Sequence, residues 1–322
     1  IRSLFLNKEA LEKGAVRPKD VPDQRVKKLG VLGAGMMGAG IALVSAQAGI
    51  EVVLIDRDQE AADKGKAYSA TYMDKGIARK KATLEKKEAL LSLITATPDV
   101  EMLKGCDLII EAVYEDPAVK AEITKRVEAV IPVDCIFASN TSTLPISELA
   151  KASSRPEQFI GIHFFSPVEK MLLVEIIKGD QTDDVAVAKS LDYVRQIRKT
   201  PIVVNDARFF YANRCIIPYG NEAARMVTEG VAPQLIDNAA QQLGFPVGPI
   251  QLGDETSIDL GVRIMKATKA AMGNAYPASD ADDLIVWMEG LGRLGRKANA
   301  GYFDYDEKGK RTGYWKGVHD KY

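Results

Sequence analysis

The run KLGVLGAGMMG, residues 28–38, sets the architecture of this chain. Its apolar part, Leu29–Leu32, predicts a buried strand, and a helical pattern follows the last glycine. Glycines at this spacing allow a tight strand-to-helix turn, the close approach of a pyrophosphate and close packing of helix on strand. The helix start then offers N–H groups to the phosphates. The cofactor-binding residues expected here are Gly33, Gly35, Met36, Met37 and Gly38.

An acidic residue follows at the position that such a motif requires. Asp56 lies eighteen residues after Gly38 and ends a second apolar run, Val52–Ile55. A carboxylate there can accept both ribose hydroxyls and would repel a 2′-phosphate, so it favours NAD over NADP. Arg57 beside it weakens that preference. A glycine fingerprint alone is weak evidence, whereas strand, glycines, helix, strand and acid in this order predict an NAD-binding domain.

Short apolar runs alternate with amphipathic helical patterns from residue 28 to residue 204. This alternation predicts an α/β domain of the Rossmann type, a doubly wound and mostly parallel sheet with helices on both faces. The expected strands are Leu29–Leu32, Val52–Ile55, Leu93–Thr97, Leu108–Ile110, Ile136–Ala138, Phe159–Ile162, Leu172–Ile177 and Ile202–Val204. The Lys/Glu-rich stretch from Glu60 to Leu91 predicts two helices that project from the sheet, either as a solvated appendage or as a ligand-gripping hairpin.

Helical periodicity replaces this alternation after Asp206, which predicts a second, all-helical C-terminal domain over residues 205–322. Its expected helices are Tyr211–Glu229, Pro233–Leu243 and Ser257–Met272. The aromatic and charged tail, Gly301–Tyr322, is expected to pack on it as an irregular lid. Residues 1–27 read as a linker helix and connector outside the core.

Composition narrows the class of protein. The net charge of −1 gives no reason to expect nucleic acid or an anionic membrane as a partner, and no apolar run approaches the length of a membrane span. The three cysteines are scattered, so we expect a reducing compartment and no structural disulfide. The two histidines lie far apart, so a metal site has little support. At 322 residues, two domains are expected.

The segment from Gly161 to Glu175 carries the candidate chemistry. His163 is one of two histidines, and Glu175 follows twelve residues later inside an apolar strand pattern. An imidazole accepts or gives a proton near neutral pH, and a carboxylate on its second nitrogen fixes the tautomer and stabilises the imidazolium. Burying Glu175 unpaired would be costly, so it needs a partner such as His163. A core histidine bonded to the backbone is the alternative.

Two further groups of polar residues lie where a ligand is expected. The run Ser139–Thr143 follows an apolar strand, and ligands of open α/β sheets lie beyond the carboxyl ends of strands. These residues are equally suited to capping the helix expected near Ile146. Asn213 and Arg214 open the first helix of the second domain, where a cap or a domain contact is the alternative role.

Together these residues resemble the L-3-hydroxyacyl-CoA dehydrogenase family, from about residue 28 to residue 306. The resemblance rests on four motifs in the family's order: Gly33–Gly38, Ser139–Ser142, His163–Val168 with Glu175, and Asn213-Arg214. Residues 1–27 and the run Gly292–Lys297 are most similar to the dehydrogenase portion of multifunctional fatty-acid β-oxidation proteins. In those proteins a hydratase/isomerase part precedes this region and a second helical repeat follows it.

The resemblance implies a role for each matching position. His163 is similar to the general base that takes the proton of the 3-hydroxyl, and Glu175 to its orienting carboxylate. Ser142 and Asn213 correspond to hydrogen-bonding groups around the reacting oxygen and the thioester. Glu115 and Lys120 match positions at the nicotinamide-ribose end of the cofactor, and the helical stretch 60–91 matches the part that embraces coenzyme A. Phe209 departs from the family, which usually has glycine there, so the domain junction is expected to differ.

The implied reaction is the oxidation of an L-3-hydroxyacyl-CoA to a 3-ketoacyl-CoA with NAD. Three alternatives stay open: a 3-ketoacyl-CoA reductase, another hydroxy-acid dehydrogenase, and a catalytically idle fragment that keeps the binding fold. The chain does not begin with methionine, which suggests a piece of a longer polypeptide whose other domains are partners. A homodimer is a further possibility. The expected location is the bacterial cytoplasm, with peroxisome and mitochondrion as alternatives.

Overall fold

The computed structural model describes residues 2–322, apart from the side chain of Leu4. Its contacts divide the chain into two compact units, one that ends at Ala212 and one that comprises Asn213–Tyr322. We call them the first unit and the second unit. The first unit thus extends beyond residue 204 and includes the residues that follow the last strand of its sheet.

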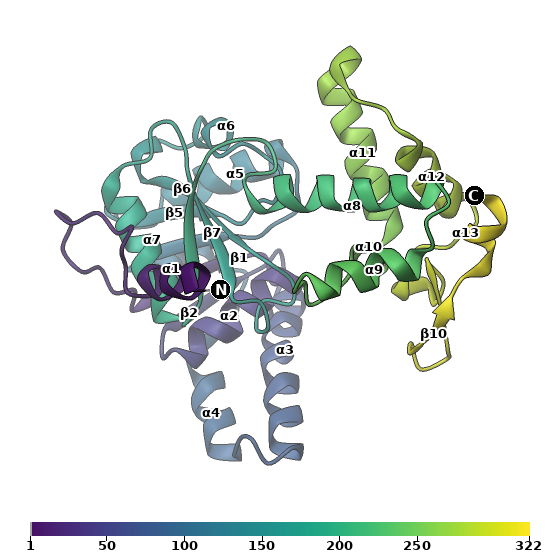
Figure 1. Cartoon of the computed structure of the whole chain (residues 1–322). Helices are drawn as coiled ribbons and strands as arrows, with labels where there is room; N and C mark the ends of the chain where they lie inside the picture. The colour runs from purple at the N-terminus through teal and green to yellow at the C-terminus, as the bar shows by residue number, and fades with distance from the viewer. Residues whose placement is uncertain (1) are drawn as a thin grey trace. The chain divides into compact units, whose positions relative to one another are not determined.

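The first unit is built on an eight-stranded sheet in the order β3-β2-β1-β4-β5-β6-β7-β8 (Figure 1). All neighbouring strands run parallel except β6 and β7. The strands are β1 Lys28–Leu32, β2 Glu51–Ile55, β3 Ile94–Thr97, β4 Leu108–Glu111, β5 Ile136–Ser139, β6 Phe159–Phe164, β7 Leu173–Lys178 and β8 Thr200–Asn205. Each expected strand is present, and the predicted Rossmann-type sheet is confirmed.

Helices cover both faces of this sheet. Leu29 and Val31 of β1 belong to a buried cluster that also takes residues from α2 (Met36–Gln47) and α7 (Asp184–Gln196). Leu32 belongs to a second cluster, which contains residues of α5 (Pro117–Glu128) and α6 (Ile146–Ala150). Strands buried on both faces have nearly continuous apolar sequences, which explains why their positions could be predicted.

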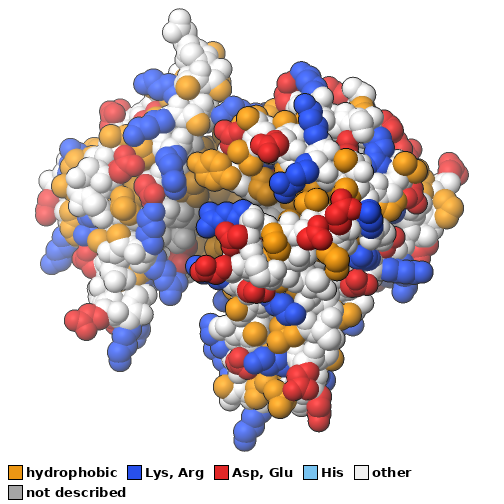
Figure 2. Space-filling view, turned by 180° about the vertical axis from the view of Figure 1, so that it is seen from behind, with side chains coloured by type: hydrophobic (Ala, Val, Ile, Leu, Met, Phe, Trp, Pro, Cys, Tyr) orange, Lys and Arg blue, Asp and Glu red, His pale blue; other side chains and the backbone are white. Residues whose placement is uncertain are grey.

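The expected helical pair projects from the sheet as α3 (Gln59–Ala78) and α4 (Leu84–Ser92), which pack side by side (Figure 1). An ion pair between Lys87 and Asp74 at 2.6 Å joins them, and the Thr83 side chain accepts a hydrogen bond that starts α4. On the face that the space-filling view shows, cationic and anionic side chains are interspersed (Figure 2).

The N-terminal segment is tied to the sheet domain. After α1 (Arg2–Glu12), the Arg17 guanidinium makes two bonds of 2.8 Å to Asp192 of α7 and also donates to carbonyls of its own segment. Val26 is 1% exposed and belongs to the main core cluster. The expectation that residues 1–27 lie outside the core is therefore wrong at Val26, whose side chain packs in the core that the α2 and α7 residues also form.

The second unit is mainly helical, as expected, but its tail is not irregular. Phe303–Tyr305 (β9) and Arg311–Tyr314 (β10) form an antiparallel pair. Its turn is closed by Asp306, whose carboxylate accepts two backbone N–H bonds, and by Gly309 at φ +71°. The α-helices are α8 Ala212–Thr228, α9 Pro233–Gln242, α10 Pro249–Thr256, α11 Ile258–Met272, α12 Asp280–Gly290 and α13 Lys316–Lys321. Short 3₁₀ helices span Gly273–Ala275 and Arg296–Ala298 in this unit, and Val100–Leu103 and Pro156–Gln158 in the first unit.

Buried carboxylates organise the second unit. Asp254 of α10 accepts bonds from the N–H groups of Tyr302 and Phe303 at 2.7 and 3.0 Å and from the Tyr305 hydroxyl at 2.9 Å, which fixes the start of the hairpin. Asp237 of α9 accepts the N–H of Ile250 at 2.8 Å and thereby holds the first turn of α10.

Within residues 2–322, no helix is both long and apolar enough to cross a bilayer.

Candidate active site

Of the three glycines in and after the loop between β1 and α2, only Gly35 has open space where a side chain would lie. Gly33 has φ +93°, and a Cβ there would lie 2.6 Å from the Ala112 carbonyl oxygen. A Cβ on Gly38 would lie 1.8 Å from the Gly33 carbonyl oxygen. Both positions therefore exclude any side chain. A Cβ on Gly35, by contrast, would meet no atom within 4 Å, so the start of α2 is open to a phosphate-bearing ligand.

Asp56 braces this loop from the end of β2. Its Oδ2 accepts the Ala34 N–H at 2.7 Å, and its Oδ1 accepts the Arg57 N–H at 2.7 Å. Each carboxylate oxygen has further lone-pair capacity for ribose hydroxyls. The exposed Arg57 guanidinium pairs with Asp58 at 3.0 Å. The open space at Gly35, the helix start and this acidic side chain together fit NAD.

His163 and Glu175 face each other across the antiparallel pair β6–β7, where they are direct register partners. Nδ1 of the imidazole lies 2.7 Å from Oε2 of the carboxylate. Since an ionised carboxylate can only accept, Nδ1 carries the proton and Nε2 is the nitrogen that can take another. Glu175 is 0% exposed, and its Oε1 accepts the N–H groups of Tyr211 and Ala212 at 3.0 and 2.7 Å. The buried carboxylate is thus fully engaged.

Two aromatic rings pack around the imidazole. The Phe165 ring centroid lies 4.5 Å from that of His163, and the Phe210 centroid lies 5.9 Å from it. Phe209 and Phe210 have φ of +68° and +51°, in the left-handed region that favours glycine. The backbone at Phe209 thus has a conformation that glycine, the residue expected there from the resemblance, would adopt without strain.

The loop between His163 and Glu175 is clamped by a buried lysine. Nζ of Lys199 donates to the carbonyls of Val168 and Met171, at 2.5 Å each. Burial lowers the pKa of Lys199, although the nearby Glu169 charge opposes this. The buried Val168 packs against Gly40 of α2. A Cβ added at Gly40 would lie 2.8 Å from the Cβ of Val168. The loop is thereby fixed between Lys199, which directly precedes β8, and the helix that follows the glycine loop.

A buried polar network joins the ends of β4 and β5. Oε1 of Glu111 accepts from the Lys120 ammonium at 2.8 Å, and its Oε2 accepts from the Ser139 hydroxyl at 2.7 Å. Lys120 also pairs with Glu115 at 3.2 Å, and Glu115 accepts a bond from the Thr141 hydroxyl. Burial raises the pKa of Glu115, but the Lys120 charge and the hydroxyl bonds outweigh it and lower that pKa overall.

Glu111 was not among the residues singled out in the sequence. As the last residue of an apolar strand, it gives no signal of a partner, because Lys120 reaches it from α5 and Ser139 from β5. Of the predicted pair Glu115 and Lys120, only Glu115 is substantially accessible, with 37% of its side chain exposed. Lys120 is buried between the two carboxylates.

The other predicted residues lie on the loop after β5 and at the start of α8. The Ser142 N–H donates to Glu115 at 3.3 Å, which ties the Ser142 loop to the network. The Asn140 side chain accepts the N–H of Phe164, the neighbour of His163, at 2.9 Å. Asn213 is the second residue of α8 and the first of the second unit. The α6 cap, suggested as an alternative role for the Ser139–Thr143 run, comes instead from Asp206, which accepts the N–H groups of Ile146 and Ser147.

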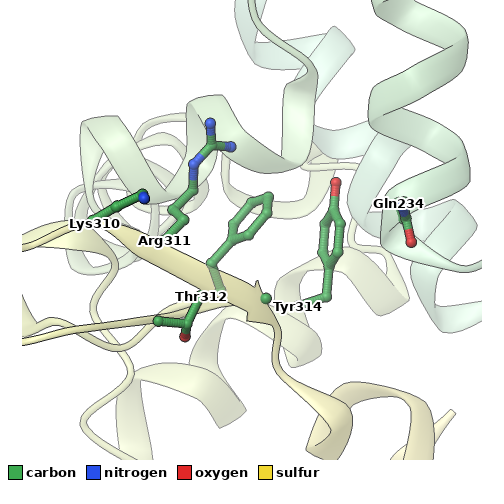
Figure 3. A pocket seen from close by; sticks show the side chains of 7 residues that line it. Gln234, Lys310, Arg311, Thr312 and Tyr314 are labelled. Atoms are coloured by element: carbon green, nitrogen blue, oxygen red, sulfur yellow. The ribbon is translucent and has the colours of Figure 1, made fainter.

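A pocket in the second unit contains none of these residues. It lies along β10, where Arg311 stacks on Phe303 at 4.9 Å, and Gln234 of α9 borders it (Figure 3). The Tyr314 hydroxyl there donates to Asp237 at 3.2 Å. Among the described residues, no three His, Cys, Asp or Glu side chains gather in a group that could hold a metal ion.

The strand, glycine loop and helix with Asp56 at the end of β2 form the NAD-binding unit of a dehydrogenase-type domain, and the His163–Glu175 pair lies at the same edge of the sheet. The chain belongs to the 3-hydroxyacyl-CoA dehydrogenase family. Residues 28–207 match the NAD-binding domain of that family, and residues 210–305 match its C-terminal domain.

Curated relatives are considerably longer than this chain. A fatty acid oxidation complex subunit alpha of Shewanella sp. (strain W3-18-1) is 40% identical over 313 residues, which are 97% of this chain and 44% of that protein. The homologous subunit of Shewanella putrefaciens is 39% identical over the same share. The chain thus spans less than half the length of these relatives and is similar to the dehydrogenase portion of a multifunctional fatty-acid oxidation protein.

Solved structures show the same fold. The (S)-3-hydroxybutyryl-CoA dehydrogenase of Ralstonia eutropha superimposes with a TM-score of 0.81 at 35% identity, over 88% of this chain and 100% of that one. The dehydrogenase part of multifunctional enzyme 1 of C. elegans covers 98% of this chain and 74% of its own, with a TM-score of 0.67 and 26% identity.

Proposed function

We propose that this chain catalyses the NAD-dependent oxidation of L-3-hydroxyacyl-CoA to 3-ketoacyl-CoA in fatty-acid β-oxidation. The contact of 2.7 Å between His163 Nδ1 and Glu175 Oε2 carries the proposal, because it leaves Nε2 as the base of an alcohol oxidation. The two residues lie on the antiparallel strands β6 and β7. They are at the edge of the sheet where the glycine loop also lies.

In this mechanism His163 takes the proton of the 3-hydroxyl at Nε2, and Glu175 stabilises the imidazolium that results. NAD held at the glycine loop would supply the hydride acceptor for C3, so that proton and hydride together would account for the two hydrogens lost. Ser142 and Asn213 are proposed to hold the reacting oxygen and the thioester. Phe165 and Phe210 keep water from the imidazole and restrict its rotation.

The wider context is also a proposal. Residues 28–204 would serve as the cofactor domain, residues 205–322 as the helical domain, and residues 1–27 as the connector to other parts of a longer protein. The relatives are bacterial subunits of a fatty acid oxidation complex, which supports a cytoplasmic location and acyl-CoA substrates. Self-association as a homodimer belongs to the same set of proposals.

The experiment follows the NADH absorbance band with the purified chain, acetoacetyl-CoA and NADH, and repeats it with NADPH. We expect turnover with NADH, and we expect His163→Ala to lower it by about 10²–10⁴-fold, the usual contribution of general acid–base catalysis. NAD binding should be nearly unchanged in that variant.

The other histidine provides the matched control. His319 lies on α13 in the second unit, and His319→Ala should keep the wild-type rate. Turnover of His163→Ala within threefold of wild type would remove the proposed base. A flat trace for the wild-type chain, with NAD binding demonstrated separately, would mean that the chain keeps the binding fold without catalysis.

A further inference from the structure

The network of Glu111, Lys120 and Glu115 lies on one side of the dinucleotide-binding crevice. Asp56, the ribose partner on the adenosine side, ends β2, which flanks β1 on one side. Glu111 ends β4, which flanks β1 on the other. A dinucleotide crosses such a sheet at the point where the strand order reverses, next to β1. The network therefore lies on the side that receives the nicotinamide half.

The three side chains do not balance in charge. The Lys120 ammonium lies 2.8 Å from Glu111 and 3.2 Å from Glu115, so two carboxylates share one cation. Glu111 and Lys120 are 1% and 3% exposed at the side chain, whereas Glu115 is 37% exposed. The group carries a net charge of −1, and its accessible end is the anionic one.

Glu115 is held so that this charge persists at neutral pH. Its Oε1 accepts from the Thr141 hydroxyl, from the Thr143 hydroxyl at 3.2 Å and from the Ser142 N–H at 3.3 Å. Burial alone would raise the pKa of Glu115, but Lys120 and these hydroxyls lower it below its ordinary value. The carboxylate is thus ionised and fixed in direction, as a preorganised charge must be.

We propose that the Glu111–Lys120–Glu115 group favours the cationic nicotinamide ring of NAD⁺ over the neutral ring of NADH. The two forms of the cofactor differ in charge only at this ring, so a fixed anion on this side discriminates between them. A single charge about 4–10 Å away, at an effective dielectric constant of about 40 (between a protein surface and water), changes relative affinity by about three- to thirty-fold. The remaining contacts are common to both forms.

The preference for NAD⁺ concerns cofactor exchange during the proposed oxidation, and its role there rests on the proposed function. Compared with a neutral site, the charged site binds NAD⁺ more tightly relative to NADH. Such a site is suited to bind the oxidised cofactor and to release the reduced one. Release of product limits the turnover of many enzymes. The charge would therefore ease the exchange of NADH for NAD⁺ after each oxidation, and it leaves the overall equilibrium of the reaction unchanged.

Equilibrium binding of NAD⁺ and NADH, measured by calorimetry on the full chain, tests the proposal. For Glu115→Gln we expect the ratio of Kd(NAD⁺) to Kd(NADH) to rise by about three- to thirty-fold. Glu115→Asp, which keeps the charge, should retain most of the wild-type ratio. ADP binding reports the adenosine side and the folded state, and it should be the same in all variants.

The control for overall charge is Glu122→Gln. Glu122 lies exposed on α5, the helix that carries Lys120, so its replacement removes the same charge from the protein without touching the group. A ratio unchanged in Glu115→Gln, with both forms weakened equally, would overturn the proposal in favour of a hydrogen-bonding role. An equal shift of the ratio in Glu122→Gln would overturn it too. These measurements need no catalysis, so failure of the proposed function would leave their outcome readable.

Discussion

The two carboxylate oxygens of Glu175 have different partners. Its Oε2 holds His163, while its Oε1 accepts two N–H groups at the start of α8. In Glu175→Gln the amide presents an NH₂ group to one of these sets of donors, so one contact is lost and a buried donor is left unsatisfied. We expect the free energy of unfolding to fall by about 1–3 kcal/mol and the rate per folded molecule to fall by at least tenfold.

Thermal unfolding and active-site-normalised kinetics of Glu175→Gln check both parts. A lower melting temperature with an unchanged rate per folded molecule would show that Glu175 serves the helix start only. A lower rate at unchanged stability would show the opposite.

Phe209 provides a second prediction at this scale. At φ +68° a residue with a Cβ is strained by about 1–2 kcal/mol, whereas the extra freedom of glycine in the unfolded chain costs about 0.5–1 kcal/mol. Phe209→Gly and Phe209→Ala both remove the ring and its contact with Arg208. We therefore expect the glycine variant to be more stable than the alanine variant, by about 0.5–1 kcal/mol, in chemical denaturation. The reverse order would show that this backbone is not strained.

At the scale of the structural elements, the loop from Phe165 to Met171 is held by the buried Lys199 ammonium. Lys199→Met removes the donor to two carbonyls of this loop and keeps an unbranched side chain that is one atom shorter. We expect unfolding free energy to fall by about 2–4 kcal/mol, since buried carbonyls are left without partners. Turnover should fall as well, because the loop carries Phe165 against His163. Denaturation curves and steady-state rates measure both effects.

The neighbouring exposed Lys170 gives the control for this loop. Lys170→Met changes the same charge on the loop itself and should leave stability within about 0.5 kcal/mol of wild type. If Lys199→Met were equally mild, the two carbonyls would have to find other partners, and the clamp would be dispensable.

The elements of the sheet could be predicted because their sequences are short and apolar. Every strand from β1 to β8 was found to within a few residues, since parallel strands buried on both faces leave a continuous apolar signal. The β9–β10 hairpin could not be predicted in this way. Its strands are charged and aromatic, and β9 is held by hydrogen bonds to the Asp254 carboxylate. Helix α12, Asp280–Gly290, was not predicted either, since its acidic first turn and apolar last turns lack a clear helical face.

The candidate site was predicted in part for a similar reason. His163 and Glu175 were recognisable as a pair because both occur in one short segment. Glu111 and Lys199 were not recognisable from the sequence. Their partners lie on other strands, helices and loops and meet them only in the folded chain. Sequence patterns report periodicity and local spacing, whereas these contacts depend on the order of strands in the sheet.

For the whole molecule, the two units should respond oppositely to acid. In the first unit, burial would raise the pKa of Asp192, but its bonds to Arg17 and Gln24 lower it. Asp192 and Glu115 thus add stability that is present at neutral pH and lost as pH falls through their lowered pKa values. In the second unit, burial raises the pKa of Asp237 and Asp254 despite their hydrogen bonds. These two groups stabilise the folded state fully below their ordinary pKa, and this contribution is lost as pH rises.

Acidification from about pH 7 to about pH 3 should therefore destabilise the first unit relative to the second. Both tryptophans, Trp287 and Trp315, lie in the second unit, so their fluorescence reports its melting, while far-UV circular dichroism reports both units. We expect the tryptophan midpoint minus the dichroism midpoint to increase at low pH. A difference that stays constant or decreases would contradict the assigned signs.

The double engagement of Glu175 has a consequence for anyone who would transplant this chemistry. A histidine and a glutamate copied alone into another scaffold would leave one carboxylate oxygen without its backbone donors. The portable piece is larger: the antiparallel strand pair together with the chain segment around Tyr211 and Ala212. A protein engineer would have to move it as one cassette, and the acceptor fold would need a helix that begins beside its strands.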